Sequence, residues 1–320
     1  MTMTTAGARL GQNPVLTGLL TSSVAQPSLI AERLFPRLPM ALRGMTLAKI
    51  GSEGMRRYDT RRAPGTVTKK VEISWGGKVY TVDQHSVDVP IPREILQEAD
   101  LAGRLNVSAH LDVSRIAINT AMQALTTGYE AEVADLACAA GNYAGNTINI
   151  TAGGDKWSAS TGKPVTQILQ AGEAIRQKTG RRPNLLMLSA SALLAASMNA
   201  EVKSYLPSTL LGAATMDHLK TIFKVAEIVI GESVLDEGDT TSDIWGNNAI
   251  LAYVPPMGTG GMQMVLGEPS FGFTSVLEGH PFAEVPRYDG DSKSWIYGAT
   301  FERQGNIVTP GAGFLIQNPA

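Results

Sequence analysis

Residues 110–140 read HLDVSRIAINTAMQALTTGYEAEVADLACAA, and the spacing of their apolar side chains is the strongest guide to the fold. Seven positions follow one another at steps of three or four residues: Ile118, Met122, Leu125, Tyr129, Val133, Leu136 and Ala140. This spacing puts them on one helix face, so we predict a helix over 110–140 that Gly141 closes. At 1.5 Å per residue it is about 45 Å long. A coiled coil is the alternative, but alanine-rich stretches and few flanking charges argue against it.

The flanking sequence predicts a mixture of helices and strands, that is, the α+β class. Before residue 110, we expect an extended arm at 1–44, because prolines interrupt it and leave room for a helix only at 28–34. A second short helix is expected at 93–99. After 140, we expect helices at 163–178 and 189–199 around a buried strand at 185–188. Further strands are expected at 226–230, 249–254, 261–266 and 294–303.

The segment 71–82 predicts a β-hairpin. The runs VEISW and KVYTV flank Gly76-Gly77, and such a pair is typical of a tight two-residue turn. In that register Trp75 opposes Lys78 and Ile73 opposes Tyr80, which gives one apolar face. A lone two-stranded hairpin is marginal in water, so this face must dock on the protein's own core or on another copy.

Charge is distributed unevenly along the chain. Residues 1–82 contain 12 Lys or Arg and 4 Asp or Glu, a net charge of +8, whereas residues 83–320 contain 15 and 25, a net of −10. Much of the basic charge is the cluster Arg56, Arg57, Arg61 and Arg62 around Tyr58. These arginines suit nucleic-acid phosphates, acidic side chains of a neighbouring copy, or a solvated loop. The sequence does not rank these three.

Composition narrows the class of protein. With 320 residues, 43% of them hydrophobic, the chain can build a sizeable core. Cys138 is the only cysteine, which excludes an intrachain disulfide framework. The first 20 residues lack the pattern of a secretory signal, and no apolar run approaches membrane-spanning length.

No enzyme motif is found, and we predict no catalytic, cofactor-binding or metal-ligating residues. The glycine-rich stretch 257–261 lacks the Gly-Lys-Ser/Thr of a phosphate loop, so we interpret it as flexible. The acidic stretch 236–243 lacks the spacing of a calcium loop. Four histidines, His85, His110, His218 and His280, show no ligand spacing, and Cys138 is expected to pack inside the long helix.

The order of these segments resembles the tailed-bacteriophage major capsid proteins with the Hong Kong 97-type fold, over nearly the whole chain. The basic, β-rich segment 45–86 looks like the family's extended loop (E-loop), and DVPIPREIL at 88–96 is similar to its entry into the peripheral domain. The helix at 110–140 resembles the spine helix. Trp157, then GKPVTQIL at 162–169 and GRRPNLLML at 180–188, and IWGNNAILAYV at 244–254 are similar to the axial domain.

The resemblance implies a domain organisation: an N-terminal arm at 1–44, the E-loop at 45–86, a peripheral domain at 87–155 and 291–320, and an axial domain at 156–290. It also implies assembly of copies into hexamers and pentamers that form the icosahedral head shell around double-stranded DNA. The E-loop would lie over the spine helix of the adjacent subunit. The residues expected at this subunit interface are Arg56, Arg57, Arg61, Arg62, Ile73, Trp75, Lys78 and Tyr80.

The resemblance also implies partners and location. We expect a separate scaffolding protein, a portal, a decoration protein in some cases, non-specific contact with packaged DNA, and no membrane. Assembly is expected in the bacterial cytoplasm, and the product is the virion head. Lys69, Lys70 and Lys78 lie in the loop where some members form covalent crosslinks, but no matching Asn or Glu motif is found, so crosslinking is not predicted.

Three alternatives remain open. An encapsulin-like cellular compartment shares the fold. An enzyme with an unrecognised site would be a monomer with a well-formed pocket. A nucleic-acid-binding protein would bind DNA in a strongly salt-dependent manner, and the acidic balance of the chain argues against it.

Overall fold

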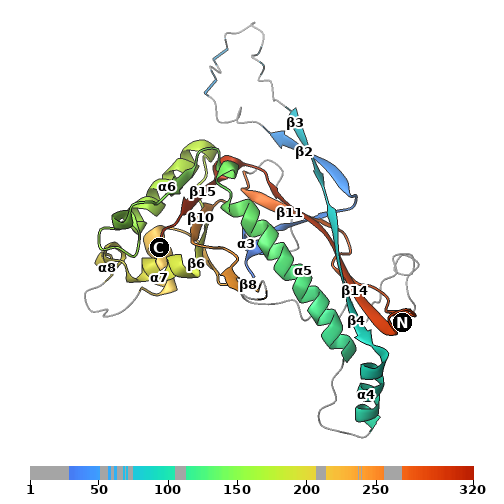
Figure 1. Cartoon of the computed structure of the whole chain (residues 1–320). Coiled ribbons are helices and arrows are strands. Elements are labelled where there is room, and N and C mark those ends of the chain that lie inside the picture. Colours follow the sequence, from blue (N-terminus) through green and yellow to red (C-terminus); the bar gives the residue numbers. More distant parts are fainter. Residues whose placement is uncertain are drawn as a thin grey trace.

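The computed structural model describes residues 29–50, 57–58, 61–62, 68, 70, 75–104, 113–206, 214–236, 238, 240–255 and 269–320. It contains a five-stranded and a six-stranded sheet, a long helix that runs between them, and a two-stranded ribbon that projects from the body (Figure 1). This mixture of helices and sheets confirms the predicted α+β class.

The five-stranded sheet has helices over one face. Its strands, in spatial order, are β5 (Thr147–Asn149), β15 (Gly313–Gln317), β10 (Asn248–Ala252), β6 (Leu185–Ser189) and β7 (Glu227–Gly231). The helices are α6 (Pro164–Thr179), α7 (Ala190–Met198), α8 (Ala200–Ser204) and α9 (Met216–Phe223). Pro164 begins α6, and Gly180 ends it in the left-handed conformation. The predicted elements α6, β6 and α7 are confirmed to within two residues.

The six-stranded sheet is built around the long strand β14 (Ser294–Ile307). Its other strands are β1 (Arg37–Met40), β11 (Gly272–Leu277), β12 (Phe282–Ala283), β13 (Arg287–Asp289) and β4 (Asp83–Pro92). β4 lies antiparallel to β14 along its whole length, from Pro92 opposite Ser294 to Asp83 opposite Arg303. At the Pro92 end the chain turns into α4 (Arg93–Arg104), which extends beyond the sheet (Figure 1).

The long helix α5 (Val113–Cys138) confirms the predicted spine and joins the two sheets. Its 26 residues span about 39 Å. Met122 and Leu125 pack in the core of the six-stranded sheet, whereas Tyr129 and Val133 pack in the core behind the five-stranded sheet.

The end of α5 differs from the prediction. The helix stops at Cys138, and the chain then forms a 3-10 turn, η2 (Ala140–Tyr143), that contains Gly141. The Tyr143 hydroxyl and the Asn142 side chain donate hydrogen bonds to carbonyls of the last helical turn. These side chains satisfy the helix end in place of a glycine cap.

The predicted tight turn at Gly76-Gly77 is wrong. Both glycines lie inside strand β3 (Trp75–Thr81), which pairs antiparallel with β2 (Gly44–Ile50). Tyr80 therefore opposes Met45 instead of Ile73, which lies outside the described residues. A Cβ on Gly77 would lie 2.7 Å from Cγ2 of Thr46, so the glycine serves the close approach of the two strands.

The last part of the predicted arm belongs to the body. Residues 29–40 form α3 (Ala31–Leu34) and β1, which pairs parallel with β11. Leu34 and Phe35 are fully buried, so an extended arm ending at residue 44 is wrong for this stretch. The first part of the expected arm, residues 1–28, lies outside the described residues, as does the strand expected at 261–266.

Each of the two sheets contains strands from both sides of the expected domain boundaries, which stay a prediction. β15, expected in the peripheral domain, lies in the five-stranded sheet between β5 and β10. β11 to β13, expected in the axial domain, belong to the six-stranded sheet. The remaining short elements are η3 (Gly153–Asp155), the hairpin β8 (Val234–Asp236) and β9 (Thr241–Asp243), and η4 (Pro310–Ala312).

Candidate assembly interface

The root of the β2–β3 ribbon is fixed to its own chain. Tyr80 is buried, and its ring centre lies 5.0 Å from that of Phe273 on β11. Val82, two residues further along, is also buried. The apolar side of β3 therefore docks on the protein's own core. Tyr80, which we expected at a subunit interface, packs in the core of its own chain with 5% of its surface exposed.

The other side of β3 is open. Val79 is 64% exposed, which is unusual for a β-branched residue in a strand. Lys78 lies on the same side of β3 as Tyr80 but is exposed, and its ammonium lies 5.4 Å from the centre of the Tyr80 ring. Beyond these residues the ribbon strands pair only with each other among the described residues. The ribbon is thus a projecting, two-sided surface with a single point of attachment.

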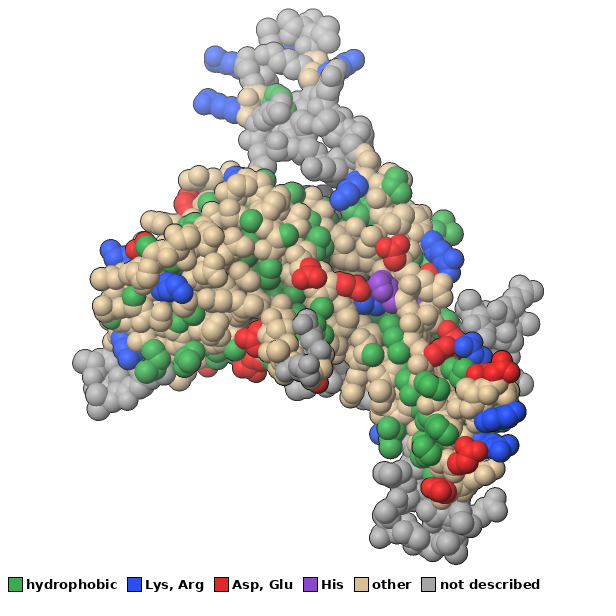
Figure 2. All heavy atoms as spheres, in the orientation of Figure 1, with side chains coloured by type: hydrophobic (Ala, Val, Ile, Leu, Met, Phe, Trp, Pro, Cys, Tyr) green, Lys and Arg blue, Asp and Glu red, His purple; other side chains and the backbone are tan. Residues whose placement is uncertain are grey.

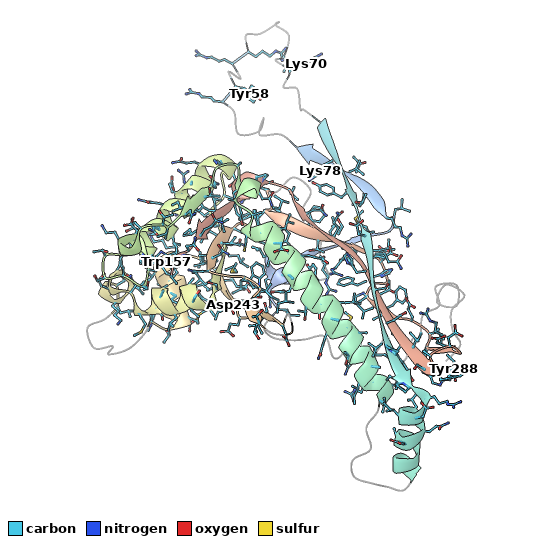
Figure 3. The ribbon with its side chains drawn as sticks, in the orientation of Figure 1. Tyr58, Lys70, Lys78, Trp157, Asp243 and Tyr288 are labelled. Atoms are coloured by element: carbon cyan, nitrogen blue, oxygen red, sulfur yellow. The ribbon has the colours of Figure 1, made fainter. Side chains whose placement is uncertain are left out.

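Basic side chains gather at the far end of this projection. Arg57, Arg61 and Arg62 are exposed, and Tyr58 between them is 39% exposed. Figure 2 shows Lys and Arg side chains around this end, and Figure 3 shows Tyr58 and Lys70 far from the body. Of the other residues expected at the interface, Arg56 lies outside the described residues, and Trp75 is placed in β3 without a described side chain.

A second exposed apolar surface lies at the opposite end of β14. Tyr288 and Trp295 are cross-strand partners with ring centres 5.5 Å apart, and they are 43% and 38% exposed. Ile95 on α4 and Ile116 on α5 are each about half exposed. Figure 3 shows Tyr288 far from the ribbon. The sequence does not point to these residues, because only the pairing of β13 with β14 brings the two rings together.

A groove of about 560 Å³ lies on the helical side of the five-stranded sheet. Its lining includes the loop from Trp157 to Ser160, the α7 residues Leu194 and Met198, and Ala320. Leu194 and Met198 are 67% and 54% exposed. Trp157 itself is buried and donates from its ring nitrogen to Gln167 at 2.7 Å, which fixes the floor of the groove.

Two buried charged residues stabilise the junction between the sheets, and neither was found from the sequence. Glu130 on α5 is fully buried and accepts hydrogen bonds from the backbone nitrogens of Ile30 and Ala31, each at 2.9 Å. Burial raises the pKa of Glu130, and these hydrogen bonds partly oppose the rise. Helical periodicity identifies buried positions by their apolar side chains, so it does not predict that an acidic residue such as Glu130 is buried.

Arg303 on β14 is the second buried charge, with 1% of its surface exposed. Its guanidinium carbon lies 5.2 Å from the ring centre of Tyr129 and 4.9 Å from that of Phe301. Nη2 donates to Glu132 at 3.0 Å, while Nε and Nη1 have no hydrogen-bond partner among the described residues. Burial lowers the pKa of Arg303. Aromatic rings thus replace part of the solvation of this cation.

Metal-binding clusters and the single cysteine were the two candidate features for chemistry. No group of three or more His, Cys, Asp or Glu in this part of the chain is placed to share a metal ion. Cys138 is partly buried, and burial raises its pKa to about 12, so its thiol is a poor nucleophile. Within the same ranges no helix has the length and apolar content needed to cross a bilayer.

Comparison with known proteins identifies the family. No protein-family model matches the chain. The chain is 32% identical over 306 residues, 95% of either chain, to the major capsid protein of Burkholderia phage BcepMu. Among solved structures it resembles a phage-related protein from Bordetella bronchiseptica RB50, with a TM-score of 0.74, 30% identity and coverage of 96% of this chain and 97% of the other.

More distant solved structures share the fold alone. A virus-like particle protein from Pyrococcus furiosus has a TM-score of 0.56 at 10% identity, covering 95% of this chain and 98% of the other. The capsid structure of cyanophage P-SCSP1u has a TM-score of 0.55 at 14% identity, covering 89% and 86%. The resemblance to the Hong Kong 97-type capsid fold is thereby confirmed. The chain belongs to the phage major capsid proteins, whose role in the virion is structural.

Proposed function

We propose that copies of this chain assemble into hexamers and pentamers that form the icosahedral head shell around phage double-stranded DNA. The observation that carries the proposal is the β2–β3 ribbon, which projects from the body and exposes Val79 and a group of arginines. A two-stranded ribbon gains little stability by itself, so its exposed surface is best explained by contact with another copy.

The distribution of charge along the chain suggests that the ribbon binds the body of an adjacent subunit. The ribbon lies in the part of the chain with a net charge of +8, and residues 83–320 carry −10. Arg57, Arg61 and Arg62 can pair with carboxylates of the next copy through two parallel hydrogen bonds each. Each exposed pair contributes little, but the same contact repeated around a ring stabilises a closed shell.

The two sheets suggest a revised domain assignment. We assign the peripheral domain to the six-stranded sheet with α4 and the first part of α5, and the axial domain to the five-stranded sheet with its helices. The Tyr288–Trp295 end and the α7 groove lie on different domains, and both expose apolar surface. They are candidate contacts with further neighbours, in addition to the ribbon.

The remaining partners follow from this role. Assembly in the bacterial cytoplasm would use a separate scaffolding protein and a portal, with a decoration protein on the finished head in some cases. Contact with packaged DNA would be non-specific, because a shell with an acidic overall balance offers few sites for phosphates.

The test removes the outer loop and leaves the root of the ribbon intact. Ile50 opposes Trp75, so residues 51–74 can be replaced by Asn-Gly, which closes the two strands with a tight primed turn. We expect the full chain, expressed with its neighbouring phage genes, to form shells or capsomer rings in negative-stain electron microscopy. The shortened chain should fold but remain unassembled. Shells of normal size from the shortened chain would contradict the proposal.

The same experiment separates the alternatives. A clean monomer of the full chain under every condition would favour an enzyme with an unrecognised site. Shells that form without phage proteins and enclose a cellular enzyme would favour an encapsulin-like compartment. Shells that package DNA in the presence of the phage genes support the head-shell function.

A further inference from the structure

The ribbon leaves the six-stranded sheet at one residue. β4 pairs with β14 from Pro92 to Asp83, which lies opposite Arg303. Val82 links β4 to the preceding strand β3, which pairs with β2 instead. β14 continues in its own direction and pairs with β11 from Arg303 to Ile307. The angle between ribbon and sheet therefore depends on contacts made at this fork.

An ion pair crosses the fork. The guanidinium of Arg43, the residue just before β2, donates from Nε to Oε2 of Glu302 at 2.9 Å and from Nη2 to Oε1 at 2.6 Å. The carboxylate belongs to β14 and is 5% exposed, whereas the arginine side chain is 68% exposed. The backbone carbonyl of Arg43 also accepts a hydrogen bond from the nitrogen of Val82 at 3.1 Å. Arg43 thus joins both strands of the ribbon to β14.

His280 supports the carboxylate from the inner side. Its Nδ1 accepts a hydrogen bond from the backbone nitrogen of Glu302 at 3.1 Å, and its Nε2 lies 3.9 Å from Oε1. The imidazole is 5% exposed, and its ring packs edge-on against Phe282 with centres 4.8 Å apart. A buried, oriented carboxylate that receives a two-pronged arginine fixes direction as well as distance.

We propose that Glu302 is a positioning residue that sets the angle of the ribbon through Arg43. This proposal rests on the proposed function, in which the ribbon engages the next copy. Because the ribbon projects well beyond its root, a small rotation at the fork displaces the far end by much more (Figure 1). Subunits with a loosened fork would therefore still fold but would build shells of mixed curvature.

The test compares Arg43→Gln, Arg43→Lys and the matched control Arg287→Gln in the full chain. Arg287 forms a 2.7 Å pair with Asp88 at the other end of the same sheet. Hydrogen exchange of the unassembled subunit reports on the fork without requiring a shell. We expect amides of residues 77–82 to exchange about tenfold faster in Arg43→Gln, less in Arg43→Lys, and unchanged in Arg287→Gln.

Electron microscopy of the same variants then supplies the shell diameters. A broadened diameter distribution for Arg43→Gln alone supports the proposal. Unchanged exchange at 77–82 in Arg43→Gln would overturn it, whether or not shells form. Exchange that rises equally across the whole chain would also overturn it, because that result indicates a general loss of stability. If the wild-type chain forms no shells, the proposed function fails while the exchange result still decides the role of Glu302.

Discussion

The indole nitrogen of Trp245 donates a hydrogen bond to the carboxylate of Glu130 at 2.7 Å, and both side chains are fully buried. The two residues are 115 positions apart in sequence. The same carboxylate holds the backbone of Ile30 and Ala31, so one acidic side chain on the spine helix connects the N-terminal segment to the core behind the five-stranded sheet.

We expect this connection to contribute strongly to stability. Trp245→Phe removes one donor and should lower the free energy of unfolding by about 2 kcal/mol, and Glu130→Ala, which leaves three N–H donors without an acceptor, by about 3 kcal/mol or more. Asp135→Asn, on an exposed position of the same helix, is the control and should change it by less than about 0.5 kcal/mol. Urea denaturation measures all three, and equal values for Glu130→Ala and the control would contradict the prediction.

Arg303 should be replaceable by an apolar side chain of similar length. Arg303→Met keeps the packing between Tyr129 and Phe301 and removes two nitrogens that lack hydrogen-bond partners among the described residues, so it should cost about 1 kcal/mol or less. Arg303→Ala leaves a cavity and should cost about 3 kcal/mol. If thermal or urea unfolding shows Met to be as damaging as Ala, then the charge itself is required.

Gly162 and Gly153 make a matched pair. A Cβ on Gly162 would lie 2.0 Å from the carbonyl oxygen of Lys156, a backbone atom that cannot move aside, whereas a Cβ on Gly153 has no atom within 4 Å. Gly162→Ala should therefore lose about 2 kcal/mol or more, through displacement of the loop that carries Trp157. Gly153→Ala should stay within about 0.5 kcal/mol of wild type. A neutral Gly162→Ala in a urea titration would show that the loop can shift freely.

The arginines of the outer loop should affect assembly without affecting folding. Changing Arg57, Arg61 and Arg62 to Gln together removes exposed charges far from the core, so the unfolding curve should not move. If they pair with the next copy, the protein concentration needed for assembly should rise about tenfold, and the salt dependence of assembly should weaken. Light scattering against protein and salt concentration gives both values. Unaltered assembly would exclude these arginines from the interface.

His280 should make stability depend on pH. Burial lowers the pKa of His280, and the nearby carboxylate of Glu302 opposes this shift only in part. The unfolded chain then takes up the proton more readily, so the stabilisation is complete above the unfolded pKa of about 6.5 and is lost as pH falls below it. Wild type should lose more stability than His280→Asn between about pH 7.5 and about pH 5. Denaturation of both proteins at each pH measures this difference. If wild type and His280→Asn lose the same free energy of unfolding, His280 does not cause the pH dependence.

The elements that can be predicted from the amino-acid sequence are those with local signals. The apolar spacing of Ile118 to Val133 predicts the spine helix, and Pro164 and Gly180 bound α6 because a proline suits the first helical turn and a glycine adopts the left-handed cap. The uneven charge and the basic loop were also evident. Each of these features depends on residues that are close together in the sequence.

Other features depend on contacts between residues far apart in the chain and could be found only in the folded structure. Gly76-Gly77 has the local form of a tight turn, yet β3 continues into β4, buries Tyr80 against Phe273 and pairs with residues 44–50, so the glycines lie within a strand. Likewise, no local pattern distinguishes Glu130 from an exposed acidic residue until Trp245 and the backbone of Ile30 supply its donors. Strand pairing and the burial of charge are settled by contacts between segments far apart in the chain, and a local pattern contains no information about which of them will meet.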